Sequence, residues 1–228
     1  MKKVSAIICA YNEDKTIKDV ILSVSEALIV SEIIVVNDGS TDNTQKIIFE
    51  CKNVCNIVDI HLLENMGKGF AMATGLEQAS NEIIVFCDAD LSNLRREHFV
   101  QLIQPIIENE AEMVLGQPTE TLINHKVNPF KSFTGQRSLL KKDILPILED
   151  IKTSRFGVET LINLYYEAQE KRVKYVMLEG LKHPTKFNKT NLSRAVKEFM
   201  FEGLQIAFIV FNNFNLISRI IHNRFNHF

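Results

Sequence analysis

Short apolar runs alternate with amphipathic stretches along the first 90 residues of the chain. The runs predict four strands: Val4–Cys9, Glu32–Val36, Ile57–Leu63 and Ile83–Cys87. Between them, apolar residues recur at the three- and four-residue spacing of a helix, as from Ile17 to Leu28. Strands that are apolar throughout and alternate with helices are typical of a parallel sheet covered on both faces. The pattern therefore predicts an α/β fold.

The pattern is less regular after Asp90. It predicts helices at Phe99–Ile107, Gln136–Leu148 and Val158–Ala168, and strands at Met113–Gly116 and Val173–Leu178. The polar stretch Gln117–Thr134 is expected to be a loop over the site. From Leu192 onward the chain is predicted to be helical and unusually apolar.

Composition places few further limits on function. A chain of 228 residues suits one domain with a tail, and a net charge of −2 gives no reason to expect a nucleic-acid partner. The four cysteines lack the spacing of a metal site, which favours reduced thiols in a cytoplasmic protein. The first apolar run is too short for a signal sequence.

Polar residues with useful chemistry follow each predicted strand. Asp88-Ala89-Asp90 closes the fourth strand, and two such carboxylates can hold a hard divalent ion against phosphate oxygens. The tripeptide alone is better explained as a solvated turn. However, ligands of parallel sheets bind beyond the carboxyl ends of the strands, so these polar segments are expected to meet at one edge.

Four segments in order carry a family resemblance: Ala10-Tyr11-Asn12-Glu13, Val35–Asp42, Asn65–Gly69 and Asp88-Ala89-Asp90. Together they resemble family 2 glycosyltransferases of the GT-A fold, over about the first half of the chain. The resemblance implies a mostly parallel central sheet with helices on both faces, followed by a C-terminal helical tail. One departure is Cys9, which stands where the family usually has proline.

The resemblance implies a donor site for a nucleoside-diphosphate sugar. Its residues would be Ala10, Tyr11 and Glu13 around the nucleoside, Asp38 against the base, Lys68 near base or phosphate, and Asp88 at the ribose or sugar. Asp90 would bind a divalent metal, Mg²⁺ or Mn²⁺, and His183 would complete the metal shell. Taken singly, a helix cap explains Asp38, a surface charge Lys68 and an exposed loop residue His183.

Two residues of the second half are further catalytic candidates beside Asp88. Glu159 lies where related enzymes place an acidic residue near the acceptor, and it would act as a general base or orient the acceptor. A glutamate that stabilises the first turn of a helix is an equally good explanation. Arg137, in the segment Gly135-Gln136-Arg137, is expected to meet a phosphate of the donor or acceptor.

The tail from residue 189 to residue 228 carries five Lys or Arg and two Glu, and residues 203–218 carry no charge. This apolar run is shorter than the roughly 20 residues of a spanning helix. It is expected to pack on the domain or form a homodimer. The alternative is an amphipathic helix in peripheral contact with the cytoplasmic membrane face. We expect a catalytic domain at 1–188, with a donor half 1–116 and an acceptor half 117–188, and a separate tail 189–228.

The predicted function is transfer of a hexose from a UDP- or GDP-linked donor to a small phosphorylated or hydroxylated acceptor, or to a polyprenyl phosphate. A single transfer is favoured over polymerisation, because the Gln-x-x-Arg-Trp signature of polymerising synthases is absent and the chain has no Trp. One alternative is a non-catalytic nucleotide-sugar-binding or membrane-associated assembly protein. A sugar-phosphate nucleotidyltransferase ranks lower, since Ala10–Glu13 lacks a glycine-rich phosphate loop.

Overall fold

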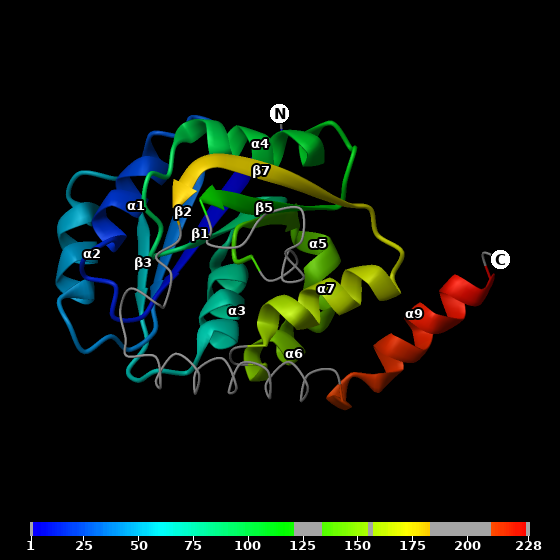
Figure 1. Ribbon diagram of the computed structural model, residues 1–228. Coiled ribbons are helices and arrows are strands. Elements are labelled where there is room, and N and C mark those ends of the chain that lie inside the picture. The colour runs from blue at the N-terminus through cyan, green and yellow to red at the C-terminus, as the bar shows by residue number, and fades with distance from the viewer. Residues whose placement is uncertain (1, 121–133, 155–156, 183–210, 227–228) are drawn as a thin grey trace.

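The computed structural model describes residues 2–120, 134–154, 157–182 and 211–226. Its centre is a seven-stranded sheet in the order β3-β2-β1-β4-β6-β5-β7 (Figure 1). The strands are β1 Val4–Ala10, β2 Glu32–Asn37, β3 Val58–His61, β4 Ile83–Asp88, β5 Met113–Glu120, β6 Arg137–Leu140 and β7 Val173–Lys182. The two pairings of β6 are antiparallel and the other pairings are parallel. The mostly parallel sheet is as predicted.

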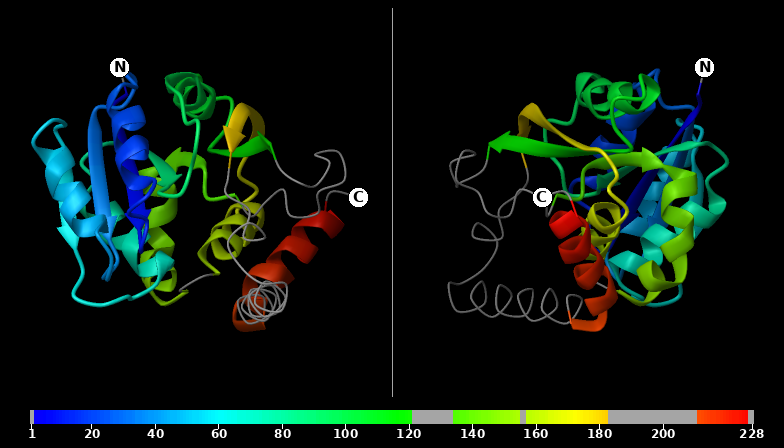
Figure 2. Two further views of the ribbon diagram at one scale, coloured as in Figure 1. Left: turned by 60° about the vertical axis from the view of Figure 1, so that its left-hand side comes forward. Right: turned by 90° about the vertical axis from the view of Figure 1, so that its right-hand side faces the viewer.

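Helices cover both faces of this sheet (Figures 1 and 2). The described helices are α1 Ile17–Ser25, α2 Thr44–Lys52, α3 Lys68–Gln78, α4 Arg96–Ile107, α5 Lys141–Ile144, α6 Leu148–Thr153, α7 Val158–Ala168 and α9 Phe214–Asn226, with a 3₁₀ turn, η2, at Leu145–Ile147. Buried side chains of α1, α2 and α4 form one core with the sheet. Those of α3 and α5–α7 form the other.

The central strand β1 shows why its sequence is apolar throughout. Ile7 and Ile8 point to opposite faces, as successive strand residues must, and each is fully buried in a different core. The strands β3 and β7 lie at the two edges of the described sheet, and they keep many partly exposed or exposed residues. Burial of both faces at the centre therefore produced the pattern that predicted the fold.

The segment Gln136–Leu148, predicted as one helix, is different in the structure. Arg137–Leu140 forms β6, which pairs antiparallel with β4 and β5, and helical structure begins only at Lys141. The apolar spacing suits either element, and the backbone hydrogen bonds available between β4 and β5 decide for the strand. β5 and β7 also run past their predicted ends, to Glu120 and Lys182, because they pair with each other.

The described part of the tail is α9, which packs beside α7 (Figure 2). Leu216 packs against the second core, the Arg224 guanidinium pairs with the Glu167 carboxylate, and Asn223 Nδ2 donates to the Ala168 carbonyl at 3.3 Å. Exposed apolar side chains remain on α9, namely Phe214, Ile221 and Phe225. Among the described residues, no helix has the length and hydrophobicity needed to cross a membrane.

Candidate active site

The carboxyl ends of the three central parallel strands meet at one edge of the sheet. In the strand register, Ala10 lies beside Asn37 and Cys9 lies beside Asp88. The Asp38 backbone N–H donates to the Ala10 carbonyl at 2.8 Å. Segments 28 and 78 residues downstream of Ala10 are thus brought beside it, as parallel pairing predicted.

The loops that follow β1 and β2 interlock through hydrogen bonds. The Asn12 N–H donates to Ser40 Oγ at 2.9 Å, and the Thr41 N–H donates back to Asn12 Oδ1 at 2.8 Å. One residue on, the Glu13 N–H donates to Thr44 Oγ1 at 2.8 Å. Ala10 is buried beneath these loops, whereas Tyr11 keeps 45% of its surface exposed. The Tyr11 ring is therefore exposed at the edge of the sheet, on a loop that several hydrogen bonds hold in place.

Asp38 is only 3% exposed and both of its oxygens have backbone donors. The Met66 and Gly67 N–H groups donate to them at 2.8 and 2.9 Å. The adjacent Gly39 has φ +67°, and a β-carbon there would lie 2.3 Å from the Glu64 carbonyl carbon. Asp38 thus ties the loop after β2 to the loop after β3, and its contact with a base stays a prediction.

Lys68 joins two of the predicted catalytic carboxylates. Its Nζ lies 2.8 Å from Asp88 Oδ1 at the end of β4 and 2.6 Å from Glu159 Oε1 in the first turn of α7. Burial alone would lower the pKa of Lys68, but the charges of Asp88 and Glu159 raise it above its usual value. The ammonium therefore stays charged and links the end of β4 to the first turn of α7.

The Cys9 thiol lies among these charged groups. Burial raises its pKa to about 12, and the charges that act on it belong to Lys68, Asp88, Asp38 and Glu159. A thiol with such a pKa is neutral at physiological pH and is not an activated nucleophile. Four predicted site residues therefore act electrostatically on the same thiol.

Gln136 is a site residue that sequence reasoning did not assign. Its amide is almost fully buried and makes two contacts with Asp88. Nε2 donates to Asp88 Oδ2 at 2.6 Å, and Oε1 accepts the Asp88 backbone N–H at 3.1 Å. The segment Gly135-Gln136-Arg137 had stood out in the sequence only for its arginine, since a single glutamine carries no chemical signal of its own.

Arg137 lies in the interior of the domain. Its side chain is fully buried, with Nη1 donating to Asn163 Oδ1 at 3.2 Å and Nη2 donating to the Thr134 carbonyl at 2.7 Å. Burial lowers the pKa of Arg137, while the charge of Glu159 raises it. The guanidinium thus contacts α7 and the turn before β6, and its contact with a phosphate stays a prediction.

The predicted metal ligands are only partly described. Asp90 is partly exposed just beyond β4, and His183 lies outside the described residues. Ser92 and Lys182 exchange backbone hydrogen bonds of 3.0 Å, so the end of β7 is paired two residues beyond Asp90. Within the described ranges, no group of three or more His, Cys, Asp or Glu side chains is placed to hold a metal ion.

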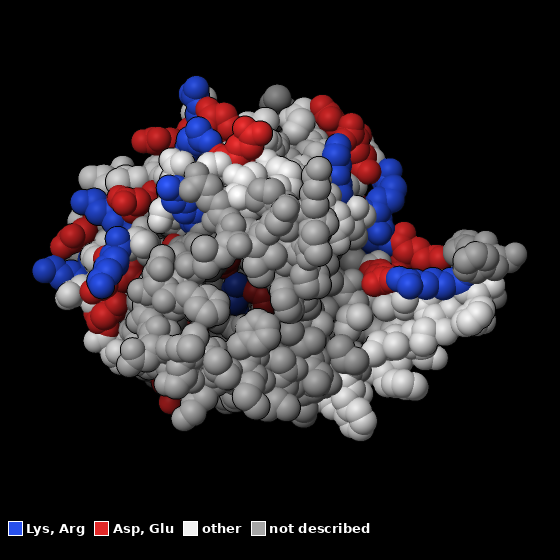
Figure 3. Space-filling view, in the orientation of Figure 1, with Lys and Arg blue, Asp and Glu red and all other residues white. Residues whose placement is uncertain are grey.

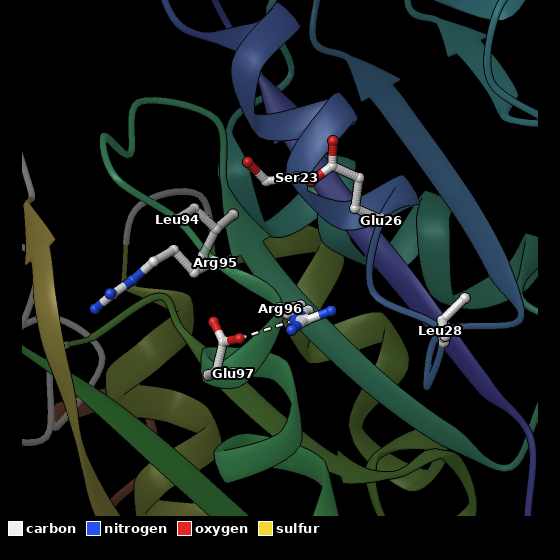
Figure 4. Close-up of a pocket in the computed structure, with 7 residues that line it drawn as sticks. All are labelled: Ser23, Glu26, Leu28, Leu94, Arg95, Arg96 and Glu97. Atoms are coloured by element: carbon white, nitrogen blue, oxygen red, sulfur yellow. Dashed lines mark hydrogen bonds and ion pairs between the residues drawn. The ribbon is translucent and has the colours of Figure 1, made fainter.

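A surface hollow lies elsewhere, between the end of α1 and the start of α4 (Figure 4). It is lined by Ser23, Glu26, Leu28, Leu94, Arg95, Arg96 and Glu97, none of which is a predicted site residue. On the face shown in Figure 3, basic and acidic side chains of the described residues are intermixed. The predicted chemistry is therefore concentrated at the strand ends.

A family model decides the assignment. The model for glycosyl transferase family 2 matches residues 5–163, which include every described residue placed above at the carboxyl edge of the sheet. The chain belongs to this family. The family resemblance that the four sequence segments predicted is confirmed.

Curated relatives match a shorter part of this family 2 chain. It is 41% identical over 88 residues to poly-beta-1,6-N-acetyl-D-glucosamine synthase of Staphylococcus epidermidis. It is 35% identical over 91 residues to the synthase of the same name from Staphylococcus aureus strain COL. These matches cover 38% and 40% of this chain but only 21% and 22% of the relatives, so the chain spans about a fifth of their length.

Solved structures match nearly the whole chain. Glucosyl-3-phosphoglycerate synthase from Mycobacterium tuberculosis, in complex with Mn²⁺, uridine diphosphate and glucosyl-3-phosphoglycerate, has a TM-score of 0.72 at 20% identity. The match covers 96% of this chain and 80% of that one. A complex of the same synthase with Mg²⁺ and uridine diphosphate has a TM-score of 0.66 at 20% identity, with coverage of 88% and 79%. This likeness confirms the predicted GT-A fold.

Proposed function

We propose that this family 2 protein transfers a hexose from a UDP- or GDP-linked donor to an acceptor. The observation that carries the proposal is the meeting of Asp88 and Glu159 on the Lys68 ammonium, at 2.8 and 2.6 Å. Asp88 ends a strand of the proposed donor half, and Glu159 begins a helix of the proposed acceptor half. A transfer reaction requires the donor and the acceptor to be bound next to each other. Asp88 and Glu159 would contact the donor and the acceptor, respectively, at neighbouring positions.

The proposed nucleoside pocket lies between the interlocked loops after β1 and β2. The exposed ring of Tyr11 is suited to stack on a base. Its loop begins at the buried Ala10 and is anchored by the hydrogen bond from the Glu13 N–H to Thr44 Oγ1. A carboxylate has about four acceptor sites, so Asp38 retains acceptor capacity for a base N–H beyond its two backbone bonds. The Asp88 carboxylate is assigned to the ribose or sugar hydroxyls for the same reason.

The donor set at the end of β4 fits a divalent cation. Mg²⁺ is commonly held by one or two carboxylates together with substrate phosphates, and Asp90 offers a partly exposed carboxylate there. We assign His183 as a second ligand, which suits Mn²⁺, because Lys182 before it pairs with Ser92 near Asp90. A bound cation would neutralise charge on the departing diphosphate. The Mn²⁺ and Mg²⁺ complexes of the structural neighbour support this assignment.

Glu159 is better suited to orient an acceptor than to deprotonate it in this arrangement. One of its oxygens, Oε1, already contacts the Lys68 ammonium at 2.6 Å. The carboxylate can still accept a hydrogen bond from an acceptor hydroxyl. General-base catalysis is the alternative role, and it would require Lys68 to leave this oxygen.

The acceptor class is proposed from the neighbours. The solved synthase was crystallised with phosphoglyceric acid and UDP-glucose, which favours a small phosphorylated acceptor over a polyprenyl phosphate. The curated relatives make a polymer, but the chain matches only about a fifth of their length. We therefore propose a single transfer.

The proposed division of the chain is a donor half 1–116, an acceptor half 117–188 and a tail 189–228. The exposed apolar side chains of α9 favour association of the tail with a second subunit or peripherally with a membrane.

Binding of nucleotide and metal to an Asp90→Asn variant tests the proposal. Thermal unfolding is followed with UDP or GDP, each with Mn²⁺, Mg²⁺ or a chelator. Nucleotide at 100 times its Kd stabilises a protein by about 2.7 kcal/mol, so the wild type is expected to shift by several degrees only when metal is present. Asp90→Asn is expected to lose this shift.

Asp150→Asn is the matched control, because it makes the same chemical change at an exposed position of α6. It is expected to respond as the wild type does. The proposal is wrong if neither nucleotide stabilises the wild type, or if Asp90→Asn responds to metal and nucleotide undiminished. Release of hexose from UDP- or GDP-hexose by the wild type then identifies the donor.

A further inference from the structure

The carboxylate of Asp88 is held by a segment 48 residues away in the sequence. We propose that Gln136 is a positioning residue for the transfer reaction, which fixes the Asp88 carboxylate in the orientation that meets the donor. This inference rests on the proposed function, since it assigns Asp88 to the donor. Gln136 itself is not proposed to touch the substrate.

Two contacts from one amide fix Asp88 more firmly than either would alone. Gln136 Nε2 donates to Asp88 Oδ2 at 2.6 Å, while Gln136 Oε1 accepts the N–H of the same residue at 3.1 Å. The contacts form a closed ring between one side chain and one residue. Because Gln136 is 2% exposed, water does not readily replace it.

The second oxygen of Asp88 explains why such a contact is needed. Asp88 Oδ1 accepts from the Lys68 ammonium at 2.8 Å. A lysine is a flexible point charge that a carboxylate can follow by rotating about its side-chain bonds. With Oδ2 held by Gln136, the plane of the carboxylate is set by two donors on different elements, and its remaining lone pairs face a defined direction.

Gly135 provides space for this arrangement. A β-carbon at residue 135 would lie 2.2 Å from both carboxylate oxygens of Asp88. Real β-carbons do not approach so closely, so any larger residue would push the carboxylate away. Glycine and glutamine in succession therefore allow close approach and then supply the two hydrogen bonds.

The turn that carries Gln136 is itself anchored. Thr134 Oγ1 donates to the Gly116 carbonyl at 2.6 Å, and the Gly116 N–H donates to the Gln136 carbonyl at 2.9 Å. From below, the buried Arg137 guanidinium binds the Thr134 carbonyl and Asn163 of α7. The position of Gln136, and through it that of Asp88, is therefore set by contacts with β5 and α7.

Two variants test the role of Gln136 by different means. Gln136→Met keeps the length of the side chain but removes both hydrogen bonds to Asp88. Gly135→Ala displaces the Asp88 carboxylate without removing any polar group from the protein. Each is expected to weaken UDP binding in the presence of Mn²⁺ by about tenfold or more, measured by titration calorimetry.

Gly75→Ala is the matched control for Gly135→Ala. Its added β-carbon would meet the Ile7 side chain in the core and not Asp88. It is expected to lower the unfolding midpoint but to bind UDP with wild-type affinity. Wild-type UDP affinity in folded Gln136→Met and Gly135→Ala would overturn the positioning role. Equal weakening in all three variants would also overturn it, by showing a general effect of stability.

A measurement without nucleotide separates this inference from the proposed function. The unfolding midpoints of Gln136→Met, Asp88→Asn and the double variant are compared. If the contact positions Asp88, the double variant is expected to lose less than the sum of the two single losses. Additive losses would overturn the inference even if the wild type binds UDP. Failure of the wild type to bind any nucleotide, with non-additive losses, would instead overturn the proposed function and leave the contact established.

Discussion

Asp38 and Asp88 lie at the same edge of the sheet, but different groups bind their carboxylates. Asp38 accepts from two backbone N–H groups, those of Met66 and Gly67. Asp88 is held by the side chains of Lys68 and Gln136. Backbone donors are present whatever the side chains are, so the placement of Asp38 follows from the arrangement of loops. The placement of Asp88 depends on two particular side chains and is easier to alter by substitution.

The largest expected effect comes from removing the backbone-held carboxylate. Asp38→Ala would leave one buried and one part-buried N–H group without their acceptor, and a buried group without a partner costs about 1–3 kcal/mol. The free energy of unfolding is expected to fall by about 3 kcal/mol, measured by urea denaturation. Asp38→Asn keeps one acceptor oxygen and is expected to lose about half as much. A loss below about 1 kcal/mol for Asp38→Ala would show that water or other groups satisfy these amides.

A smaller effect is expected from the side-chain-held carboxylate. Lys68→Met leaves Asp88 and Glu159 without the ammonium between them, and their side chains are only 14% and 13% exposed. Lys68 itself is 30% exposed, so solvent screens part of the loss, and we expect about 2 kcal/mol in the free energy of unfolding.

Adding Glu159→Gln to Lys68→Met is expected to restore part of this stability, because it removes one of the two like charges. Lys152→Met is the control, since Lys152 pairs only with exposed glutamates, and it is expected to change stability little. If the double variant is no more stable than Lys68→Met, the two carboxylates do not repel each other through the vacated position.

The smallest expected effect concerns pH and the joint between α4 and β7. His98 is buried, its Nε2 lies 3.0 Å from the Glu179 carbonyl, and its Nδ1 accepts the Arg95 N–H at 3.2 Å. The pKa of His98 is lowered, mainly because its side chain is buried and also because of the charge of Arg95. The Glu179 carbonyl and the charge of Glu97 oppose this shift. The unfolded chain therefore binds the proton first. The stability from neutral His98 is present above its unfolded pKa and is lost as pH falls through the folded one.

Unfolding midpoints of the wild type and His98→Gln between about pH 7.5 and 5.5 check this expectation. The wild type is expected to lose stability over this interval. Glutamine can donate to the Glu179 carbonyl and accept from Arg95 without titrating, so the variant is expected to show a flatter dependence. Parallel curves would exclude His98 as the source of the pH dependence. His98 differs from Asp38 and Asp88 in that its ring both accepts from a backbone N–H and lies against a backbone carbonyl.

The amino-acid sequence by itself determined the central strands and the edge at which their polar ends meet. The apolar runs around Ile7, Val35 and Val85 are local patterns, and strands buried on both faces must be apolar wherever they lie in the chain. The four segments that follow these strands also sufficed for the family, because their residues are adjacent in sequence. The sequence alone was therefore enough to name Asp38, Asp88 and Asp90 as candidate site residues.

Only the tertiary structure decided how the second half meets this edge. Arg137–Leu140 has a spacing compatible with a helix, yet it is a strand because β4 and β5 offer backbone partners on both sides. The same placement buries Arg137, brings Gln136 to Asp88 and sets Glu159 against Lys68. None of these contacts leaves a local pattern in the sequence. Each depends on the free energy of a pairing between residues far apart in the chain, which local spacing does not encode.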